Sequence, residues 1–305
     1  TYRETPSAWI NIGRLSMQRG ESLEAAEAFS TAGELAPKDP TPIHNLGALW
    51  ESLAIPELRG QAETVAHWMA LGFVHGVMNT DNMAVSGETI DYGPCAFMDA
   101  YHPDTVFSSI DRGGRYAWSE QPRVAVWNLA QLASCLIPIM GDEQTAVAEA
   151  TEIVHGFPEL YQAAWLRRFA AKLGLAAPEP SDRALVEQLL DLMAAQKADF
   201  TRVFRGLATG DAAAEFADPA PFEAWRADWQ ARDPDCALAL RVNPVRIPRN
   251  HRIQQVIEAG VHGDFEPFAA LGEALRLPFE DRPEWADLSL PPREGEEVRV
   301  TFCGT

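Results

Sequence analysis

The amino-acid sequence predicts a mainly α-helical protein with one small β-hairpin and an N-terminal helical hairpin. Two observations support this fold class. Apolar residues recur three and four positions apart through most of the chain, with Gly or Pro between such segments. Only residues 83–90 show a pattern typical of two short strands around a tight turn. The chain has 305 residues, 47% of them hydrophobic, and we expect a boundary between residues 1–56 and 57–305.

The first 56 residues follow the pattern of a tetratricopeptide (TPR) repeat, a helix pair of about 34 residues. The residues that fit this pattern are Trp9, Ile12, Gly13, Gly20, Ala25, Phe29, Ala32 and Pro37. A second unit begins near Pro40, where Asn45-Leu46-Gly47 and Trp50 repeat the first helix, and it breaks off at about Leu53 to Pro56. Since a stable stack normally needs about three repeats, we expect this piece to pack on the body or to belong to a longer array. An ordinary Ala-rich helical hairpin is the alternative.

Helical spacing continues beyond this segment. Ala62, Val65, Ala66 and Met69 share one helix face, and Gly72 is well placed to end that helix. Further helices are expected at Leu129–Ile139, Thr145–Val154, Leu160–Leu173, Arg183–Lys197 and Phe265–Leu275. Segments 208–222 and 278–296 are rich in Pro, Asp and Glu, and we expect them to form surface loops.

Residues 75–93 combine oxygen-bearing side chains with a predicted tight turn. A two-residue turn at Ser86-Gly87 would pair residues 83–85 with residues 88–90, so that Asn82 opposes Asp91. Directly opposed side chains lie about 5 Å apart on one face of a hairpin. An amide oxygen and a carboxylate suit Mg²⁺, which completes its octahedron with water and substrate phosphates. Asp81 adds a third oxygen group, although an Asp-Asn pair in a plain turn is the alternative.

The spacing of these residues is similar to that of protein kinases. A kinase catalytic loop has an Asn seven residues after its His, followed by a Mg²⁺-binding Asp in an Asp-Phe-Gly turn. Here His75 precedes Asn82 by seven residues, and Asp91-Tyr92-Gly93 follows. Val77 occupies the position of the kinase catalytic base, which disfavours a conventional kinase and leaves Asp81 as the nearby base. We expect His75 to support the loop by packing and hydrogen bonding.

Over residues 57–305 the chain resembles the Selenoprotein O (SelO) family, pseudokinase-fold enzymes that transfer AMP from ATP to protein hydroxyls. Beyond residues 75–93, the resemblance rests on Gly93-Pro94, Phe97-Met98-Asp99, Gly114-Arg115-Tyr116, Gln121-Pro122, Trp127-Asn128-Leu129, Phe204-Arg205, Asn243-Pro244, Arg249-Asn250, Pro278-Phe279 and Cys303-Gly304-Thr305. It implies a kinase-like C-lobe, largely helical, with a small β-hairpin at the metal site.

The resemblance also implies roles for three residues. Asp81 would be the proton acceptor, Asn82 and Asp91 would bind Mg²⁺ or Mn²⁺, and Asp91 would also lie close to the nucleotide. AMP would pass from ATP to a Ser, Thr or Tyr hydroxyl of a protein substrate, and pyrophosphate would leave.

Part of a kinase-like site has no counterpart in this sequence. The Gly-rich loop and the phosphate-contacting Lys of such a site belong to an N-terminal lobe. No Gly-rich loop precedes His75, and the lysines are Lys38, Lys172 and Lys197. We therefore expect AMP transfer to be incomplete in this chain alone. The alternative is a non-catalytic scaffold, in which the TPR-like helices bind a protein partner and the C-lobe is a remnant.

The formal charge of −19 argues against nucleic acid and anionic membranes as partners. The short basic run Arg246–Arg252 is expected to be structural, because a lone run on so acidic a chain is a weak footprint for phosphate binding. No apolar stretch approaches about 18 residues and no signal peptide opens the chain, so a cytoplasmic location is the default expectation.

The four cysteines are too scattered for a zinc motif with paired close ligands. The resemblance draws attention to Cys303, because some SelO proteins have selenocysteine or a redox bridge at this end of the chain. Cys95 follows Asp91 closely and is the conceivable partner. We leave this pairing open, because the geometry of a disulfide is strict.

Overall fold

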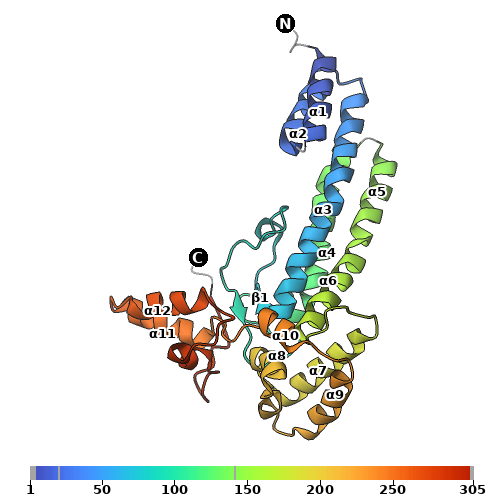
Figure 1. Cartoon of the computed structure of the whole chain (residues 1–305). Coiled ribbons are helices and arrows are strands. Elements are labelled where there is room, and N and C mark those ends of the chain that lie inside the picture. Colours follow the sequence, from blue (N-terminus) through green and yellow to red (C-terminus); the bar gives the residue numbers. More distant parts are fainter. Residues whose placement is uncertain (1–4, 20, 141, 303–305) are drawn as a thin grey trace.

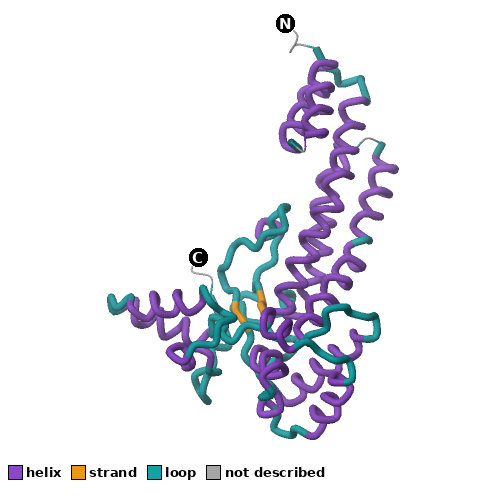
Figure 2. The backbone as a smooth tube through the Cα atoms, viewed as in Figure 1, coloured by secondary structure: helices purple, strands orange, loops and turns teal. Residues whose placement is uncertain are grey.

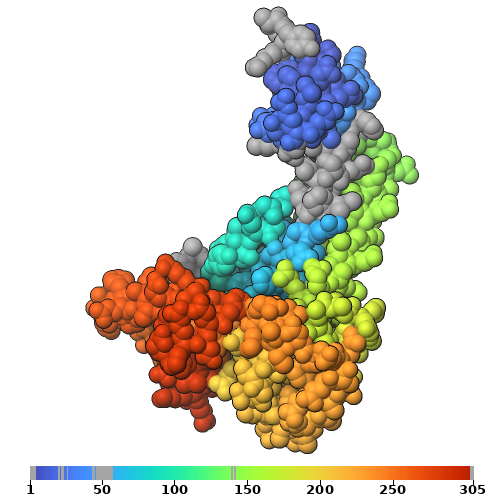
Figure 3. All heavy atoms as spheres, viewed as in Figure 1, coloured from blue at the N-terminus to red at the C-terminus, as the bar shows by residue number. Residues whose placement is uncertain are grey.

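The computed structural model describes residues 5–19, 21–140 and 142–302, without the side chains of residues 22–23, 26, 43–44, 46–57 and 139. Within these residues the chain is mainly helical, as predicted, and has one two-stranded sheet (Figures 1 and 2). A long helix, α3 (Thr41–Leu71), connects an N-terminal helix pair to a larger helical body. Figure 3 shows that α11 (Asn250–Val261) and α12 (Glu266–Leu275), coloured orange to red, project from this body.

The N-terminal pair consists of α1 (Pro6–Arg19) and α2 (Ser22–Leu35), held together by small residues around one aromatic ring. Ala25, Phe29 and Ala32 are completely buried. A Cβ atom on Gly13 would lie 2.4 Å from the Phe29 ring, so this close approach requires glycine. The helix pair expected in this part of the chain is therefore present, and its assignment as a TPR unit remains a prediction.

Helix α3 runs without interruption through residues 56 and 57, where we expect the domain boundary. It ends at Gly72, whose φ of 68° is left-handed and whose N–H bonds to the carbonyls of Met69 and Trp68. Such a glycine cap is the predicted stop signal, and it is confirmed. The C-terminal part of α3 packs against α6 (Phe157–Lys172) and contributes Val65 and Ala66 to the core.

The two strands are β1 (Phe73–Val74) and β2 (Ala96–Phe97), paired antiparallel with Phe73 opposite Phe97. The chain between them, residues 75–95, leaves the sheet and returns to it (Figure 2). We call this segment the site loop. It contains all three residues predicted to act in catalysis or metal binding.

The predicted helices after the site loop correspond to α4 (Gln121–Leu136), α5 (Glu143–His155), α6, α7 (Asp182–Gln196) and α12. Four further helices were not expected from apolar spacing: α8 (Phe200–Thr209), α9 (Ala220–Gln230), α10 (Cys236–Val242) and α11. The predicted surface loop 208–222 is wrong in part, because Phe216 and Phe222 are buried and stack on each other. None of the described helices is both long and apolar enough to cross a membrane.

The basic run is structural, as predicted. Arg249 is fully buried, and its guanidinium donates to the carboxylates of Asp99 and Asp199, the latter at 2.7 Å. Asp199 also accepts the backbone N–H of Arg202 at 2.9 Å and thereby caps α8. This ion cluster fastens the start of α11 to the segment after β2 and to α8, since buried charges of opposite sign must stay together.

Candidate functional site

The base of the site loop is held by one buried amide. Gln121, in the first turn of α4, accepts the N–H of His75 at 2.9 Å and donates to the carbonyl of Phe73 at 3.0 Å. The Nε2 atom of His75 lies 2.8 Å from the carbonyl of Ile90, which joins the outgoing and returning arms of the loop.

His75 is completely buried and its ring packs against Trp68. Burial lowers the pKa of His75, although the carbonyl of Ile90 and the charge of Asp91 act in the opposite direction. The imidazole is therefore neutral near pH 7, and the packing and hydrogen-bonding role predicted for it is confirmed.

The tip of the site loop is a hairpin-like turn, but its register differs from the predicted one. The structure pairs Met83 with Thr89, whereas a two-residue turn would pair Met83 with Ile90. The turn is closed by the N–H of Gly87 donating to the carbonyl of Ala84 at 3.0 Å, and Gly87 has a left-handed φ of 79°. A three-residue loop with a left-handed glycine shifts the register by one residue. In this register Asn82 does not directly oppose Asp91, and that prediction is wrong.

Helix α3 explains why the turn takes this form. The tip lies against α3, where Gln61 donates to the carbonyl of Ala84 and Thr64 donates to the carbonyl of Gly87. A Cβ atom on Gly87 would lie 3.0 Å from the backbone of Gly60, so the loop and the helix meet backbone to backbone. Two glycines therefore set how closely the site loop approaches α3.

The predicted catalytic and metal-binding residues all lie on this loop. Asp81 and Asn82 are in the 3₁₀ turn Thr80–Asn82, and Asp91 has a left-handed φ of 53°, a strained conformation for a residue other than glycine. Asp81 and Asp91 are exposed, and within the described residues neither carboxylate has a hydrogen bond or a salt bridge. The two acidic groups are thus free to accept a proton or to bind a cation.

Asn82 is oriented more firmly than its acidic neighbours. Its Nδ2 donates to the carbonyl of Val77 at 3.1 Å, which leaves the amide oxygen as the group available to a ligand. An amide oxygen and one carboxylate fit Mg²⁺, which commonly takes one or two protein oxygens. The described residues contain no group of three or more His, Cys, Asp and Glu placed to hold a metal ion, so any cation here would depend on water and substrate oxygens.

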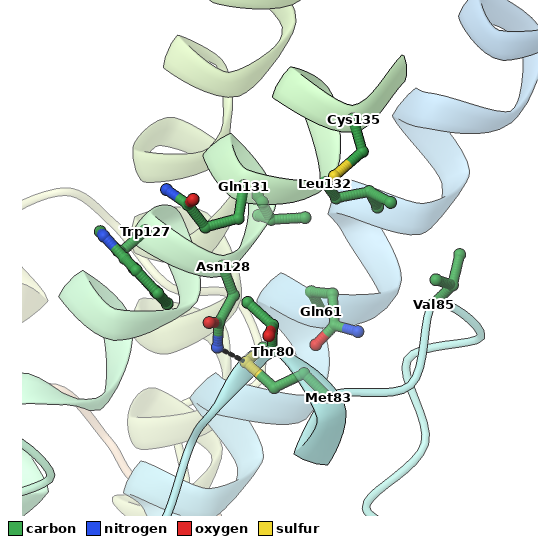
Figure 4. Close-up of a pocket in the computed structure, with 10 residues that line it drawn as sticks. Gln61, Thr80, Met83, Val85, Trp127, Asn128, Gln131, Leu132 and Cys135 are labelled. Carbon is green, nitrogen blue, oxygen red and sulfur yellow. Dashed lines mark hydrogen bonds between the residues drawn. The ribbon is translucent and has the colours of Figure 1, made fainter.

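A pocket of about 400 Å³ adjoins the 3₁₀ turn (Figure 4). Figure 4 shows Thr80 and Met83 of the site loop on one side of it, with Asn128 of α4 nearby. Apolar side chains make up most of its lining, and Trp127 at its edge is 44% exposed. Thr80, the residue directly before Asp81, lines the pocket, so the pocket lies beside the predicted proton acceptor.

Three supporting residues had no role assigned from the sequence. Besides Gln121, they are Asn128, which donates to the carbonyl of Met78 at 3.0 Å, and Tyr116, whose hydroxyl donates to Asn79 Oδ1 at 2.7 Å. All three belong to short motifs that carry the family resemblance. The motifs indicated that these positions mattered, and only the fold shows that they hold the site loop.

Cys95 ends the site loop, half buried, with its thiol 3.5 Å from the carbonyl of Tyr92. Burial raises the pKa of the Cys95 thiol, so it stays protonated near pH 7. Cys303, the other member of the conceivable bridge, lies outside the described residues.

Comparison with known proteins gives the family. The model of the family "protein adenylyltransferase SelO" matches residues 57–276. The curated "protein nucleotidyltransferase YdiU" of Ruegeria sp. (strain TM1040) is 56% identical over 250 residues, which are 80% of this chain and 53% of that protein. Those of Ruegeria pomeroyi and Roseobacter denitrificans are 54% and 55% identical, with the same shares covered.

The chain spans about half the length of the curated relatives it matches. The segment matched by the family model includes the whole site loop and more than half of the chain. This chain therefore belongs to the protein adenylyltransferase SelO family.

Proposed function

We propose that this chain carries the proton-accepting and metal-binding part of a protein adenylyltransferase. The reaction would transfer AMP from ATP to a Ser, Thr or Tyr hydroxyl of a protein, with Mg²⁺ or Mn²⁺. The observation that supports this best is the site loop itself. It presents two exposed carboxylates without hydrogen bonds or salt bridges among the described residues, on either side of an asparagine whose amide nitrogen is already bonded.

In this proposal Asp81 takes the proton of the acceptor hydroxyl. The hydroxyl oxygen then bonds to the α-phosphorus, and the bond from that phosphorus to the pyrophosphate oxygen breaks. Asn82, through its amide oxygen, and Asp91 would hold the cation, whose contribution is to neutralise charge on the phosphates. Gln121, His75 and Asn128 fix the loop, and the pocket beside Thr80 is where the acceptor side chain would approach.

A conventional kinase is the weaker assignment. Val77, at the position of the kinase base, is 8% exposed and cannot accept a proton. Protein labelling from ATP labelled on its α-phosphate, without labelling from the γ-phosphate, would separate the two reactions. Replacement of Asp81 by Asn should lower the AMP transfer rate by about 10²-fold or more and leave ATP binding unchanged, as expected for a general base.

ATP binding is the step to test first, because the chain spans about half the length of its relatives. Calorimetry with Mg²⁺ and ATP should show binding that Asp91→Ala abolishes and that Asp228→Ala, which removes an exposed carboxylate on α9, leaves intact. Binding that survives Asp91→Ala would contradict the proposed metal site.

The alternative function is a scaffold that binds a protein partner through α1 and α2. Leu15 and Leu35 of this pair are 52% and 48% exposed, which favours contact with a partner. Two results together would support the scaffold. The intact chain would bind a protein partner but not ATP, and the variant with Leu15→Ser and Leu35→Ser would lose that partner.

A further inference from the structure

A second pocket, with a cationic wall, is lined by residues near the C-terminal ends of α3, α6 and α10. Its volume is about 240 Å³, and no residue of the site loop lines it. Its charged or titratable lining residues are His67, Arg168, Lys172 and Arg241, and we call it the cation pocket. The lining residues include no carboxylate, although the chain has 44 acidic and 25 basic residues. The pocket therefore has a local excess of positive charge on an otherwise acidic protein.

Lys172 forms the buried part of this wall. It is 4% exposed, donates to Asn243 Oδ1 at 2.7 Å, and lies 4.2 Å from the centre of the Phe204 ring. Within the described residues its ammonium has no salt bridge. Burial lowers the pKa of Lys172 to about 7. A buried ammonium without a counter-ion is costly, and an anion in the pocket would offset that cost.

The other cations are also incompletely paired. Arg168 donates to Glu63 at 3.0 Å, but Glu63 is shared with Arg167, and the Nε of Arg168 is buried without a hydrogen-bond partner. Arg241 is exposed and has no hydrogen bond or salt bridge within the described residues. Burial, together with the charges of Arg168 and Lys172, lowers the pKa of His67 to about 4. The exposed Arg241 and the Nε of Arg168 are the positively charged groups of the pocket that lack a partner among the described residues.

Helix dipoles explain only part of this arrangement. Lys172 and Arg241 lie in the last turns of α6 and α10, where cations are favoured. The three helix C-termini at the pocket together count as about −1.5 charges, whereas Arg168, Lys172 and Arg241 carry up to three positive charges. Arg168 lies one turn earlier on α6, and its partner Glu63 is already neutralised by Arg167. The pocket therefore keeps a net positive charge.

We propose that the cation pocket binds a phosphate-type oxyanion, either free or as the phosphoryl group of a small metabolite. Arginine guanidinium groups donate two parallel hydrogen bonds to such oxygens, and Arg168 and Arg241 line the pocket from different helices. The volume of about 240 Å³ is several times the roughly 30 Å³ that one water molecule takes in the liquid. It therefore accommodates a phosphoryl group with a few attached carbon atoms.

Calorimetry with inorganic phosphate and, separately, with glycerol 3-phosphate tests this proposal. The titrations use the full chain at pH 7, with ionic strength held constant by sodium chloride and with EDTA present to exclude cation-mediated binding at the site loop. Saturable binding should weaken about tenfold or more in Arg241→Gln, as expected for loss of a charged hydrogen bond. Arg241 is exposed, so this substitution leaves the fold intact.

Arg59→Gln provides the matched control, because it removes an exposed positive charge from α3 outside the pocket. It should leave phosphate binding unchanged, and so should Asp91→Ala, which separates this site from the proposed catalytic one. Tighter binding of glycerol 3-phosphate would indicate a metabolite, and equal or weaker binding would indicate free phosphate. Absence of saturable binding up to about 10 mM, or equal affinity in Arg241→Gln, would overturn the proposal.

Discussion

Gln121 shows how a residue without a reacting group can decide the geometry of a site. Its amide bonds to the backbone on both sides of Val74, at the point where β1 passes into the site loop. The buried amide of Gln121 favours one backbone conformation at residues 73–75. Any other conformation would leave the amide, the N–H of His75 or the carbonyl of Phe73 without a hydrogen bond.

Replacement of Gln121 by Ala should lower the free energy of unfolding by about 1–3 kcal/mol, because the buried N–H of His75 and carbonyl of Phe73 lose their partner. Urea denaturation measures this change. Gln131→Ala, an exposed position on the same helix, is the control and should change stability little. Equal effects of the two substitutions would show that the amide does not anchor the loop.

Lys172 should make stability depend on pH. Its pKa is about 7 in the folded protein and near 10.5 in an unfolded chain, so between these values the unfolded state binds the extra proton. Stability therefore rises with pH across this window and has no slope from Lys172 below it. In Lys172→Met the slope between pH 7 and 10 should fall by up to about 1.4 kcal/mol per pH unit. Denaturation at several pH values, with Lys38→Met as an exposed control, measures it.

At the scale of elements, the turn of the site loop depends on α3. The residues Ser86-Gly87 correctly indicated a hairpin-like turn, but they could not fix its register. The register depends on Gly60 and Thr64, which lie more than twenty residues away and contact the turn only in the folded protein. Local sequence predicts that a turn exists, whereas its exact form follows from packing.

Helix prediction failed for two different reasons. Helix α10 has only 7 residues, and apolar periodicity is weak over such a length. Helix α8 was missed although its buried residues Phe200, Val203, Phe204 and Leu207 do recur at helical spacing. The start signals of both helices were present in the sequence, because Asp199 and Asp235 each accept backbone N–H groups as N-caps.

Gly87→Ala tests the fit between the turn and α3. The new Cβ would lie 3.0 Å from the backbone of Gly60, and the residue would need to keep a left-handed φ of 79°. We expect a loss of about 1–3 kcal/mol in unfolding free energy and faster proteolysis within the site loop. Gly295→Ala, which has a similar φ of 89° but open space around it, separates backbone strain from the clash.

On the scale of the whole molecule, the Arg249 cluster joins distant parts of the chain. It connects the segment after β2, the start of α8 and the start of α11 through one buried guanidinium. The sequence predicted that the basic run was structural, but not its partners, because Asp99 lies 150 residues away from Arg249.

Arg249→Ala should destabilise the protein by about 3–5 kcal/mol, since it leaves two carboxylates without their buried cation. Thermal unfolding followed by circular dichroism measures the loss. Arg282→Ala, which removes an exposed ion pair with Glu280, should have a much smaller effect. A small effect of Arg249→Ala would mean that the C-terminal helices are held mainly by apolar contacts.

Helix α3 also fixes the distance between the α1–α2 pair and the site loop. Its 31 residues form a rod of about 45 Å at 1.5 Å per residue. Near one end of this rod sits the α1–α2 pair, and the site loop is bonded to residues nearer the other end. Under the proposed function, a protein bound by the helix pair would be held at a fixed distance from Asp81. Acceptor hydroxyls would then be chosen by their distance from the docking point as well as by their neighbouring residues.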